Sequence, residues 1–394
     1  MIIGVLGDTH DCQEADIVAI VSEEFLPRKV DVIIHTGDIE KKHINPALFS
    51  HLPVVCVLTK TQTLDFDFSF PPPNWIFVRA SYAPDPPEFV GNFTDPLANK
   101  KIKQLIEMWE RYKIHCRLVP ITHNQESIMA YCGHERSFDV FNNPQRVADF
   151  FNEVNQVYDG VRLATTGHTH HQFVYRHDGL IWVNPGSVVY SWNHTKEFAV
   201  VYTDNWEVVL GRLSKSEAKI SPVTVGIVSD TGNIDDLDVN FWLRLSQEFN
   251  KRGVSKVICC GDFRPQDIGR PEFENFDVYY YLLAFYQDNN FKPNNWHLLS
   301  PTNPLVEIGG HRFYVQHEIG LEYADFSEIE SNCAFKTIVN KYKHLDFIVA
   351  GLVPGTIFQE TQKYAFINPG DARSHRCFAT ICLPRLEYTV STIS

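Results

Sequence analysis

Short runs of aliphatic and β-branched residues alternate along the chain with stretches of helical periodicity. Near the N-terminus the apolar runs are Ile2–Leu6, Val32–His35 and Val54–Leu58, and the helical stretch Glu14–Phe25 lies between the first two. Uninterrupted apolar runs of this length are typical of strands buried on both faces, as in layered α/β folds. Functional side chains in such folds collect in loops at the carboxyl ends of strands. The residues that follow each run are therefore the first candidates for chemistry.

This pattern occurs twice along the chain. Six local signals recur in the same order, and the first two aspartates are 30 residues apart in one half and 32 in the other. The matched signals are Asp8 with Asp230, Asp38 with Asp262, Trp75 with Trp296, His123 with His317, His168-Thr169-His170 with Leu352-Val353-Pro354, and Asn184-Pro185-Gly186 with Asn368-Pro369-Gly370. Because internal repeats indicate duplicated structural units, we expect two tandem domains, residues 1–215 and 221–394.

The first half carries an insertion at roughly residues 80–116. It begins with several prolines, and Asp95-Pro96 is a helix-start signal. The apolar residues that follow have helical spacing. We expect a helix that covers an exposed flank of the domain; a lid over the site and a dimer contact are the alternatives.

Composition narrows the class of protein. Of the 394 residues, 44% are apolar and 21% charged, with a formal net charge of −13. An acidic surface repels phosphate backbones, so we expect no nonspecific binding to nucleic acid. Nine cysteines without C-x-x-C spacing argue against a disulfide framework or a zinc ribbon. The short apolar N-terminus is interpreted as a strand rather than a signal peptide, no run is long enough for a membrane helix, and we expect a cytoplasmic protein.

Aspartate and histidine follow several predicted strands of the first half. The motifs are Asp8-Thr9-His10, Gly37-Asp38, Thr122-His123-Asn124 and Gly167-His168-Thr169-His170. Carboxylates and imidazoles together suit Mn, Fe, Ni and Zn. Two such metals about 3.5–4 Å apart are an effective arrangement for phosphoester hydrolysis. The sequence therefore predicts a metal site in the first half.

In this order the motifs resemble those of the calcineurin-like metallophosphoesterases. The segment from Gly167 to Ser187 resembles the small phosphodiesterase branch, which includes the bacterial YfcE-type enzymes and a retromer subunit of the same fold. The resemblance implies an α/β protein of two tandem phosphoesterase domains, each a layered β-sandwich flanked by helices. It also implies one or two divalent ions, with Mn favoured and Fe, Ni or Zn as alternatives.

The resemblance assigns roles to individual residues. It implies that Asp8, His10 and His170 bind the first metal, that Asp38 bridges, and that His123 and His168 bind the second. Asp38 and His123 would also act in catalysis, where a metal-bound hydroxide attacks phosphorus. The supporting turn would contain Asn184 and Gly186.

One position departs from the family pattern. By register, Lys60 takes the place of the family's asparagine ligand, and an ammonium group cannot bind a metal. Lys60 can point away, can replace the second metal as a fixed positive charge toward phosphate, or can mark a site that has lost catalysis. Asn92, which lies off register in the insertion, is an alternative ligand.

Two functional hypotheses follow. The first is a metal-dependent phosphoesterase acting on a small phosphoester, with a phosphodiesterase preferred over a monoesterase. Tyr82, Tyr131, His134 and Arg136 could line its cleft, and ordinary loop residues are the simpler interpretation of all four. The second is a non-catalytic metal-binding scaffold or protein-interaction module. The second half has lost three metal residues, at Gly232, Leu352 and Pro354. We expect this half to be inactive and to pack against the first or to mediate a homodimer or protein partner.

Overall fold

The computed structural model describes most of both halves of the chain. Its described residues are 1–58, 72–79, 89–91, 118–134, 160–177, 179–189, 195–213, 222–232, 234, 238, 240–282, 293–317, 333–351, 355–361 and 363–393. Most of the predicted insertion, Lys60, Tyr82, Asn92 and Arg136 lie outside these residues. By its internal contacts the chain divides into two compact units, one made of Met1–Phe173, Gly179–Asp204 and Leu210–Lys215, the other of Val174–Asp178, Asn205–Val209 and Ser216–Ser394.

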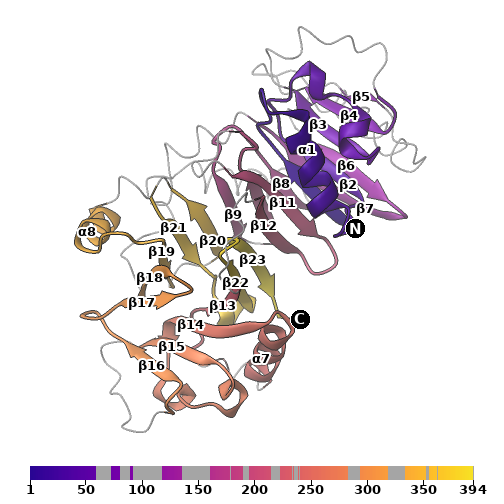
Figure 1. The fold of residues 1–394 in the computed structure, drawn as a ribbon. Helices are drawn as coiled ribbons and strands as arrows, with labels where there is room; N and C mark the ends of the chain where they lie inside the picture. Colours follow the sequence, from indigo (N-terminus) through magenta and orange to yellow (C-terminus); the bar gives the residue numbers. More distant parts are fainter. Residues whose placement is uncertain are drawn as a thin grey trace. The chain divides into compact units, whose positions relative to one another are not determined.

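The first half contains a mixed sheet in the order β12-β11-β1-β2-β3-β4-β5 (Figure 1). Its strands are β1 (Ile2–Leu6), β2 (Val32–His35), β3 (Val54–Leu58), β4 (Trp75–Arg79), β5 (Phe89–Gly91), β11 (Lys196–Tyr202) and β12 (Glu207–Leu213). Strands β1 to β4 are parallel neighbours, whereas β11 is antiparallel to β1. The three strands expected from the apolar runs are all present, and each is almost wholly buried.

A second sheet of the first half has the order β9-β10-β8-β7-β6. Its strands are β6 (Leu118–His123), β7 (Glu126–Cys132), β8 (Val161–Thr165), β9 (Gln172–His177) and β10 (Leu180–Pro185). Strands β6 and β7 form an antiparallel hairpin, and β7, β8 and β10 are parallel. The carboxyl ends of β7 and β8 therefore lie next to each other.

The second half repeats this arrangement. One part of it has the order β16-β15-β14-β13-β22-β23, and another has β17-β18-β19-β21-β20. The strands are β13 (Val223–Val228), β14 (Val254–Phe263), β15 (Asp277–Leu282), β16 (Trp296–Leu299), β17 (Leu305–Ile308), β18 (His311–Gln316), β19 (Phe347–Ala350), β20 (Thr356–Glu360), β21 (Ala365–Asn368), β22 (Cys377–Leu383) and β23 (Glu387–Thr392). Apart from β5, each described strand of the first half has a counterpart at the same place in these orders.

Helices are few among the described residues. They are α1 (Glu14–Ile20), α7 (Phe241–Lys251), α8 (Cys333–Lys341) and α9 (Ala372–His375), with the π-helix η1 (Val21–Phe25) and the short 3-10 helices η2 (Lys41–His43), η3 (Pro46–Phe49), η4 (Pro265–Asp267) and η5 (Pro271–Phe273). The helix predicted over Glu14–Phe25 is thus α1 continued by η1. Its last residue, Phe25, lies against Gly4 of β1, where an added Cβ would be 2.8 Å from the ring.

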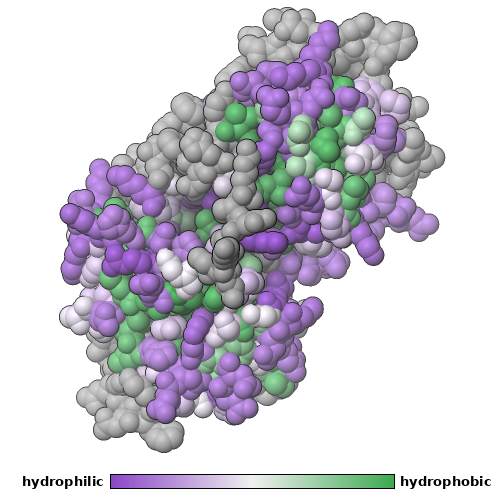
Figure 2. Space-filling model, in the orientation of Figure 1, coloured by the Kyte–Doolittle hydropathy of each residue, from purple (hydrophilic) through white to green (hydrophobic). Residues whose placement is uncertain are grey.

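Large apolar side chains fill the interior of each unit. Figure 2 shows a largely hydrophilic surface with scattered apolar residues on the face in view. Of the described large hydrophobic residues, the exposed ones are Val18, Leu26 and Leu243. No described helix is long and apolar enough to span a membrane.

Candidate metal centre

Two loops of the first half are held together at the ends of parallel strands. Asp8 and His10 follow β1, and Asp38 follows β2, its parallel neighbour. The Asp8 N–H donates to the Gly37 carbonyl (3.1 Å), and the His10 N–H donates to the Asp38 carbonyl (2.8 Å). Backbone pairing therefore continues beyond the strands and places all three side chains at one edge of the sheet.

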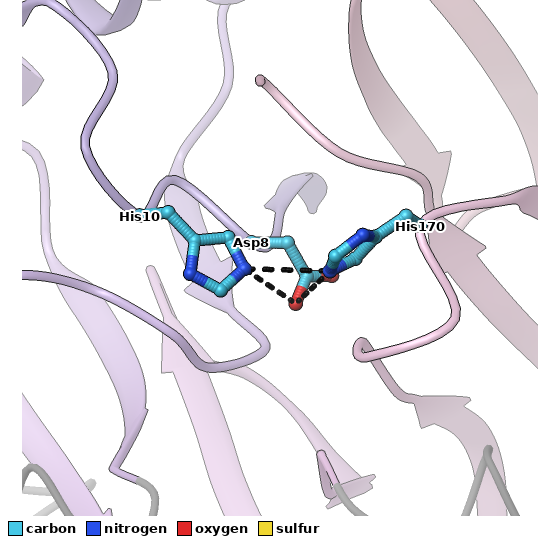
Figure 3. A group of neighbouring side chains, drawn as sticks. All are labelled: Asp8, His10 and His170. Atoms are coloured by element: carbon cyan, nitrogen blue, oxygen red, sulfur yellow. Dashed lines mark hydrogen bonds and ion pairs between the residues drawn. The ribbon is translucent and has the colours of Figure 1, made fainter. Parts of the chain in front are cut away.

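One group of ligand atoms converges from two of the strand-end loops. Asp8 and His10 from the first sheet meet His170, which follows β8 in the second sheet (Figure 3). The Nε2 atoms of the two imidazoles are 3.3 Å apart. They lie 4.0 Å (His10) and 3.6 Å (His170) from Asp8 Oδ1. Three electron-pair donors aimed at one point suit a single cation, whose charge relieves their mutual repulsion.

A second group lies next to the first and consists of Asp38, His134 and His168. His134 Nε2 is 3.1 Å from Asp38 Oδ2 and 3.2 Å from His168 Nδ1. The same Asp38 oxygen is 3.5 Å from His10 Nε2. The Asp38 carboxylate therefore adjoins both groups, which is the arrangement that a bridging ligand requires.

The tautomer of His134 follows from its surroundings. Its Nδ1 is 3.0 Å from the Thr36 carbonyl oxygen, which can only accept, so Nδ1 carries the proton. In the neutral ring this leaves the Nε2 lone pair directed toward Asp38 and His168. Metal-binding histidines usually donate their other N–H to a backbone carbonyl or carboxylate in this way, so His134 has the geometry of a ligand.

In the metal-free protein the pKa values of the two carboxylates are shifted in opposite directions. Asp8 is fully buried, and loss of hydration raises its pKa to about 7, although the His134 charge acts to lower it. Burial also acts to raise the pKa of Asp38, but the hydrogen bond and charge of His134 outweigh it and lower that pKa to about 2. Burial lowers the pKa of His170 to about 4, so this imidazole is neutral and able to bind metal.

The backbone of the site is in an uncommon conformation. Left-handed φ angles occur at five of the six clustered residues, namely Asp8 (50°), His10 (32°), Asp38 (51°), His168 (78°) and His170 (58°). Such angles are unfavourable for residues other than glycine and concentrate at functional sites. The tight pairing of the loops therefore holds strained residues in place.

Residues at the end of β10 and in the turn after it contact the loops of both sheets that carry the clustered residues. The Asn184 amide donates to Thr169 Oγ1 (2.9 Å), and its oxygen accepts from the Gly186 N–H (2.9 Å). Ser187 Oγ donates to the Asp8 carbonyl (3.0 Å). Asn184 and Gly186, predicted as site-supporting residues, thus lie directly behind the ligand loops.

The structure places His123 away from the clustered ligands. It ends β6, where its Nε2 is 3.2 Å from Asp31 Oδ1 and 2.7 Å from the Asn124 amide. The physical reason is the hairpin: β6 is antiparallel to β7, so its carboxyl end lies at the opposite edge of the sheet from the carboxyl ends of β7 and β8. His134, interpreted from sequence only as a possible cleft residue, lies in the place expected for His123. Lys60 is outside the described residues.

The strand order of the second half identifies His134 as the counterpart of His317. In the second half, a hairpin of β17 and β18 directly precedes His317. The matching hairpin of the first half is β6 and β7, which precedes Gly133-His134. Pairing the histidines by strand order rather than by the residues around His123 would have matched His317 with His134.

The corresponding position of the second half differs from the candidate metal centre. No group of three metal-binding side chains is found there among the residues that the structure describes. An added Cβ at Gly232, the counterpart of His10, would be 2.0 Å from Asp262 Oδ2, so the carboxylate fills that space. His317 Nδ1 accepts from the Asp262 N–H (3.2 Å), which leaves the proton on Nε2 in the neutral ring. Leu352–Pro354 lie outside the described residues.

Comparisons with known proteins give matches of two kinds. Residues 1–206 match the model of the calcineurin-like phosphoesterase superfamily domain. Similar solved structures include an archaeal phosphodiesterase (18% identity, TM-score 0.30, 54% of this chain and 100% of that one). Others are zinc-complexed Vps29 from Entamoeba histolytica (15%, 0.31, 56% and 96%) and the phosphoesterase YfcE from E. coli (11%, 0.27, 54% and 93%).

No protein with a curated description matches the sequence significantly. The family model nevertheless covers more than half of the 394 residues, including Asp8, His10, Asp38, His134, His168 and His170. The chain therefore belongs to the calcineurin-like phosphoesterase superfamily.

Proposed function

We propose that the first half is a metal-dependent phosphoesterase that acts on a small phosphoester, with a phosphodiester preferred over a monoester. One observation carries this proposal: the two three-ligand groups are neighbours, and Asp38 Oδ2 of the second group lies close to His10 Nε2 of the first as well as to His134 Nε2 of its own group. A set of two carboxylates and four imidazoles suits Mn²⁺ and also Fe, Ni or Zn. Bound there, such ions would act as Lewis acids, activating water and neutralising phosphate charge.

The chain's own residues have separable tasks in this proposal. Asp8, His10 and His170 would hold one ion, and His134 and His168 the other, with Asp38 between them. The hydrogen bond from His134 Nδ1 to the Thr36 carbonyl keeps Nε2 available. The Asp38 carboxyl is ionised over the whole physiological pH range, and the hydrogen bond and charge of His134 outweigh burial and lower its pKa further, to about 2.

The decisive test compares the same substitution in the two halves. Asp38→Asn removes the charge between the two groups, and we expect hydrolysis of bis(p-nitrophenyl) phosphate in Mn²⁺ to fall at least about 100-fold. Asp262→Asn, at the equivalent position of the second half, should leave turnover within about twofold of wild type. Hydrolysis of p-nitrophenyl phosphate, measured in parallel, reports the preference between diester and monoester.

The alternative is a non-catalytic metal-binding scaffold, and the same experiment separates it. Metal analysis of the purified protein that finds bound Mn²⁺, together with no turnover on either substrate, would favour the scaffold. Absence of both bound metal and turnover over a range of divalent ions would overturn both proposals.

We also propose that the second half is a degenerate copy of the first, used for packing or for binding a partner. Its strand order supports this, and so do paired contacts in the cores. Phe25 packs edge-on against Phe198 with ring centroids 5.7 Å apart, and Phe249 against Phe378 at 5.6 Å. Arginines cover the second ring of each pair, at 5.8 Å for Arg28 and 5.1 Å for Arg252.

The loops of the lost site support the same proposal. Asp230 and Asp262 keep left-handed φ angles of 53° and 40°. The Asp230 N–H donates to the Gly261 carbonyl at 3.1 Å, as the Asp8 N–H does to Gly37. Among its described residues, the second half therefore has the backbone conformation of the first-half site without a matching set of ligands.

A further inference from the structure

A histidine that belongs to neither ligand group lies beneath the paired loops. His35 is the last residue of β2 and is fully buried. The Gly37 N–H donates to its Nδ1 (3.3 Å), and its Nε2 is 3.2 Å from Thr9 Oγ1. Thr9 Oγ1 in turn is 3.3 Å from the Asp38 carbonyl. One side chain thus contacts both loops that carry the first three ligands.

The direction of each hydrogen bond in this chain is determined by the partners. An amide N–H can only donate, so Nδ1 of His35 accepts. In the neutral ring the proton is then on Nε2, which donates to Thr9 Oγ1, and the threonine hydroxyl donates to the Asp38 carbonyl. The neutral ring is the form expected here, because burial lowers the pKa of His35 to about 3.

The second half shows what this position looks like without the histidine. The counterpart of His35 is Cys259, and that of Thr9 is Thr231. Thr231 Oγ1 is buried and has no hydrogen-bond partner within the part of the chain that the structure describes. The neighbouring position is retained, since Thr36 Oγ1 donates to the Leu6 carbonyl (3.3 Å) and Cys260 Sγ to the Val228 carbonyl (3.5 Å). Among the described residues, the link across the loops is therefore missing in the half that shows no ligand cluster.

We propose that His35 is a positioning residue for the metal centre: through Thr9 it links the loop of Asp8 and His10 to the loop of Asp38. This inference rests on the proposed metal-dependent function. It assigns His35 no contact with metal or substrate. A buried group whose only task was to fill the core would not need both ring nitrogens in this order of donors and acceptors.

The experiment is a Mn²⁺ titration of matched variants by calorimetry. We expect His35→Leu and Thr9→Val each to weaken Mn²⁺ binding about 10- to 100-fold, the range for partners just outside the ligand shell. The Mn²⁺ affinity of the double variant should be close to that of the single variant with the lower affinity, because both changes break the same chain of hydrogen bonds. Thr231→Val, the matched control, should bind as wild type does. His35→Gln, which retains a side-chain N–H, should recover part of the affinity.

Amide exchange of the metal-free protein makes the outcome independent of metal binding. Exchange in residues 7–12 and 36–39 should be faster in His35→Leu and Thr9→Val than in wild type, and unchanged in Thr231→Val. If wild type binds no Mn²⁺, the proposed function fails, and exchange alone decides on His35. Unchanged exchange rates in both first-half variants would overturn the positioning role. So would wild-type Mn²⁺ affinity in both variants, and this second result would leave the proposed function standing. Thr9→Val keeps the test valid if the histidine variant does not fold, because it replaces a hydroxyl with a methyl group of similar size.

Discussion

At the level of single residues, the centre depends on which nitrogen of each imidazole carries a proton. His134 donates its Nδ1–H to a backbone carbonyl, so that loss of the Nε2 proton leaves Nε2 for a cation. His317, at the matching place in the second half, accepts a backbone N–H at Nδ1 instead. The same residue type in the same strand-end position is therefore prepared for a ligand's role in one half and unsuited to it in the other.

This difference leads to a prediction about His134 and His123. We expect His134→Ala to remove the metal of the second group, because Asp38 and His168 alone leave it two ligands. His123→Ala should retain it, since His123 contacts Asp31 at the far edge of the sheet. Metal stoichiometry by mass spectrometry of the dialysed variants measures both. Loss of metal in His123→Ala together with retention in His134→Ala would contradict the assignment.

A second prediction concerns protons displaced by metal. The raised pKa of Asp8, about 7, means that the metal-free native state keeps a proton that an ordinary carboxyl loses near pH 4. The pKa of His134 is also raised, by its Asp38 hydrogen bond and nearby carboxylates acting against burial. Ligands must lose these protons, so Mn²⁺ affinity should fall and proton release should increase as pH decreases through 7.

Calorimetry at pH 6 and pH 8 in buffers of different ionisation enthalpy measures the released protons. Asp8→Asn should reduce the release at pH 6. Equal release at the two pH values in wild type would show that Asp8 is already ionised before metal binds.

Five of the six clustered residues could be identified from sequence because they belong to short Asp- and His-containing motifs in loops that follow strands. They are Asp8, His10, Asp38, His168 and His170. His134 could not be identified in that way, since its role depends on which strand of a hairpin is parallel to β8. That is a property of sheet pairing, and local residue patterns around His123 and His134 do not encode it.

At the level of elements, the site is built from turns that continue strand pairing past the strand ends. One of these turns follows β10. In it, Gly186 has φ 81° and lies against Glu197. An added Cβ there would be 2.0 Å from Glu197 Oε2. Glu197 also accepts the Ser187 N–H (3.2 Å), so movement of this carboxylate disturbs the turn that holds the Asp8 loop.

We therefore predict that Gly186→Ala destabilises the protein by at least about 3 kcal/mol, from backbone strain and overpacking together. Gly179→Ala is the matched control, because Gly179 has φ 80° but an added Cβ would have no atom of the described residues within 4 Å. It should cost only the left-handed conformation, about 1–2 kcal/mol. Urea unfolding of both variants gives the difference, and equal losses of stability would exclude the contact with Glu197 as the cause.

The strands that precede these turns could be predicted from the apolar pattern, as β1, β2 and β3 show. The conversion of the last turn of the first helix to the π-helix η1 could not. Helical periodicity does not separate i+4 from i+5 hydrogen bonding over one turn, because both place Val21 and Phe25 on the buried face.

At the level of the whole molecule, the two halves have similar strand orders, but we expect a metal ion to stabilise only the first. Ligand binding stabilises only the state that contains the site. We predict that Mn²⁺ slows amide exchange in residues 7–12 and 36–40 and leaves the matching residues 229–234 and 260–264 unchanged. Exchange mass spectrometry with and without Mn²⁺ tests this. Protection of the second set to the same extent would show that the second half also binds metal.

The left-handed backbone at Asp230 and Asp262 has a historical consequence. In the degenerate copy proposed above, selection for metal binding no longer acts on these positions, so strand pairing itself would maintain these angles. Few residue types tolerate them, chiefly glycine, asparagine and aspartate. Neutral substitution at both positions is therefore restricted to these few residue types. On this proposal, the two aspartates are retained because the backbone geometry requires them, and not because they bind a metal.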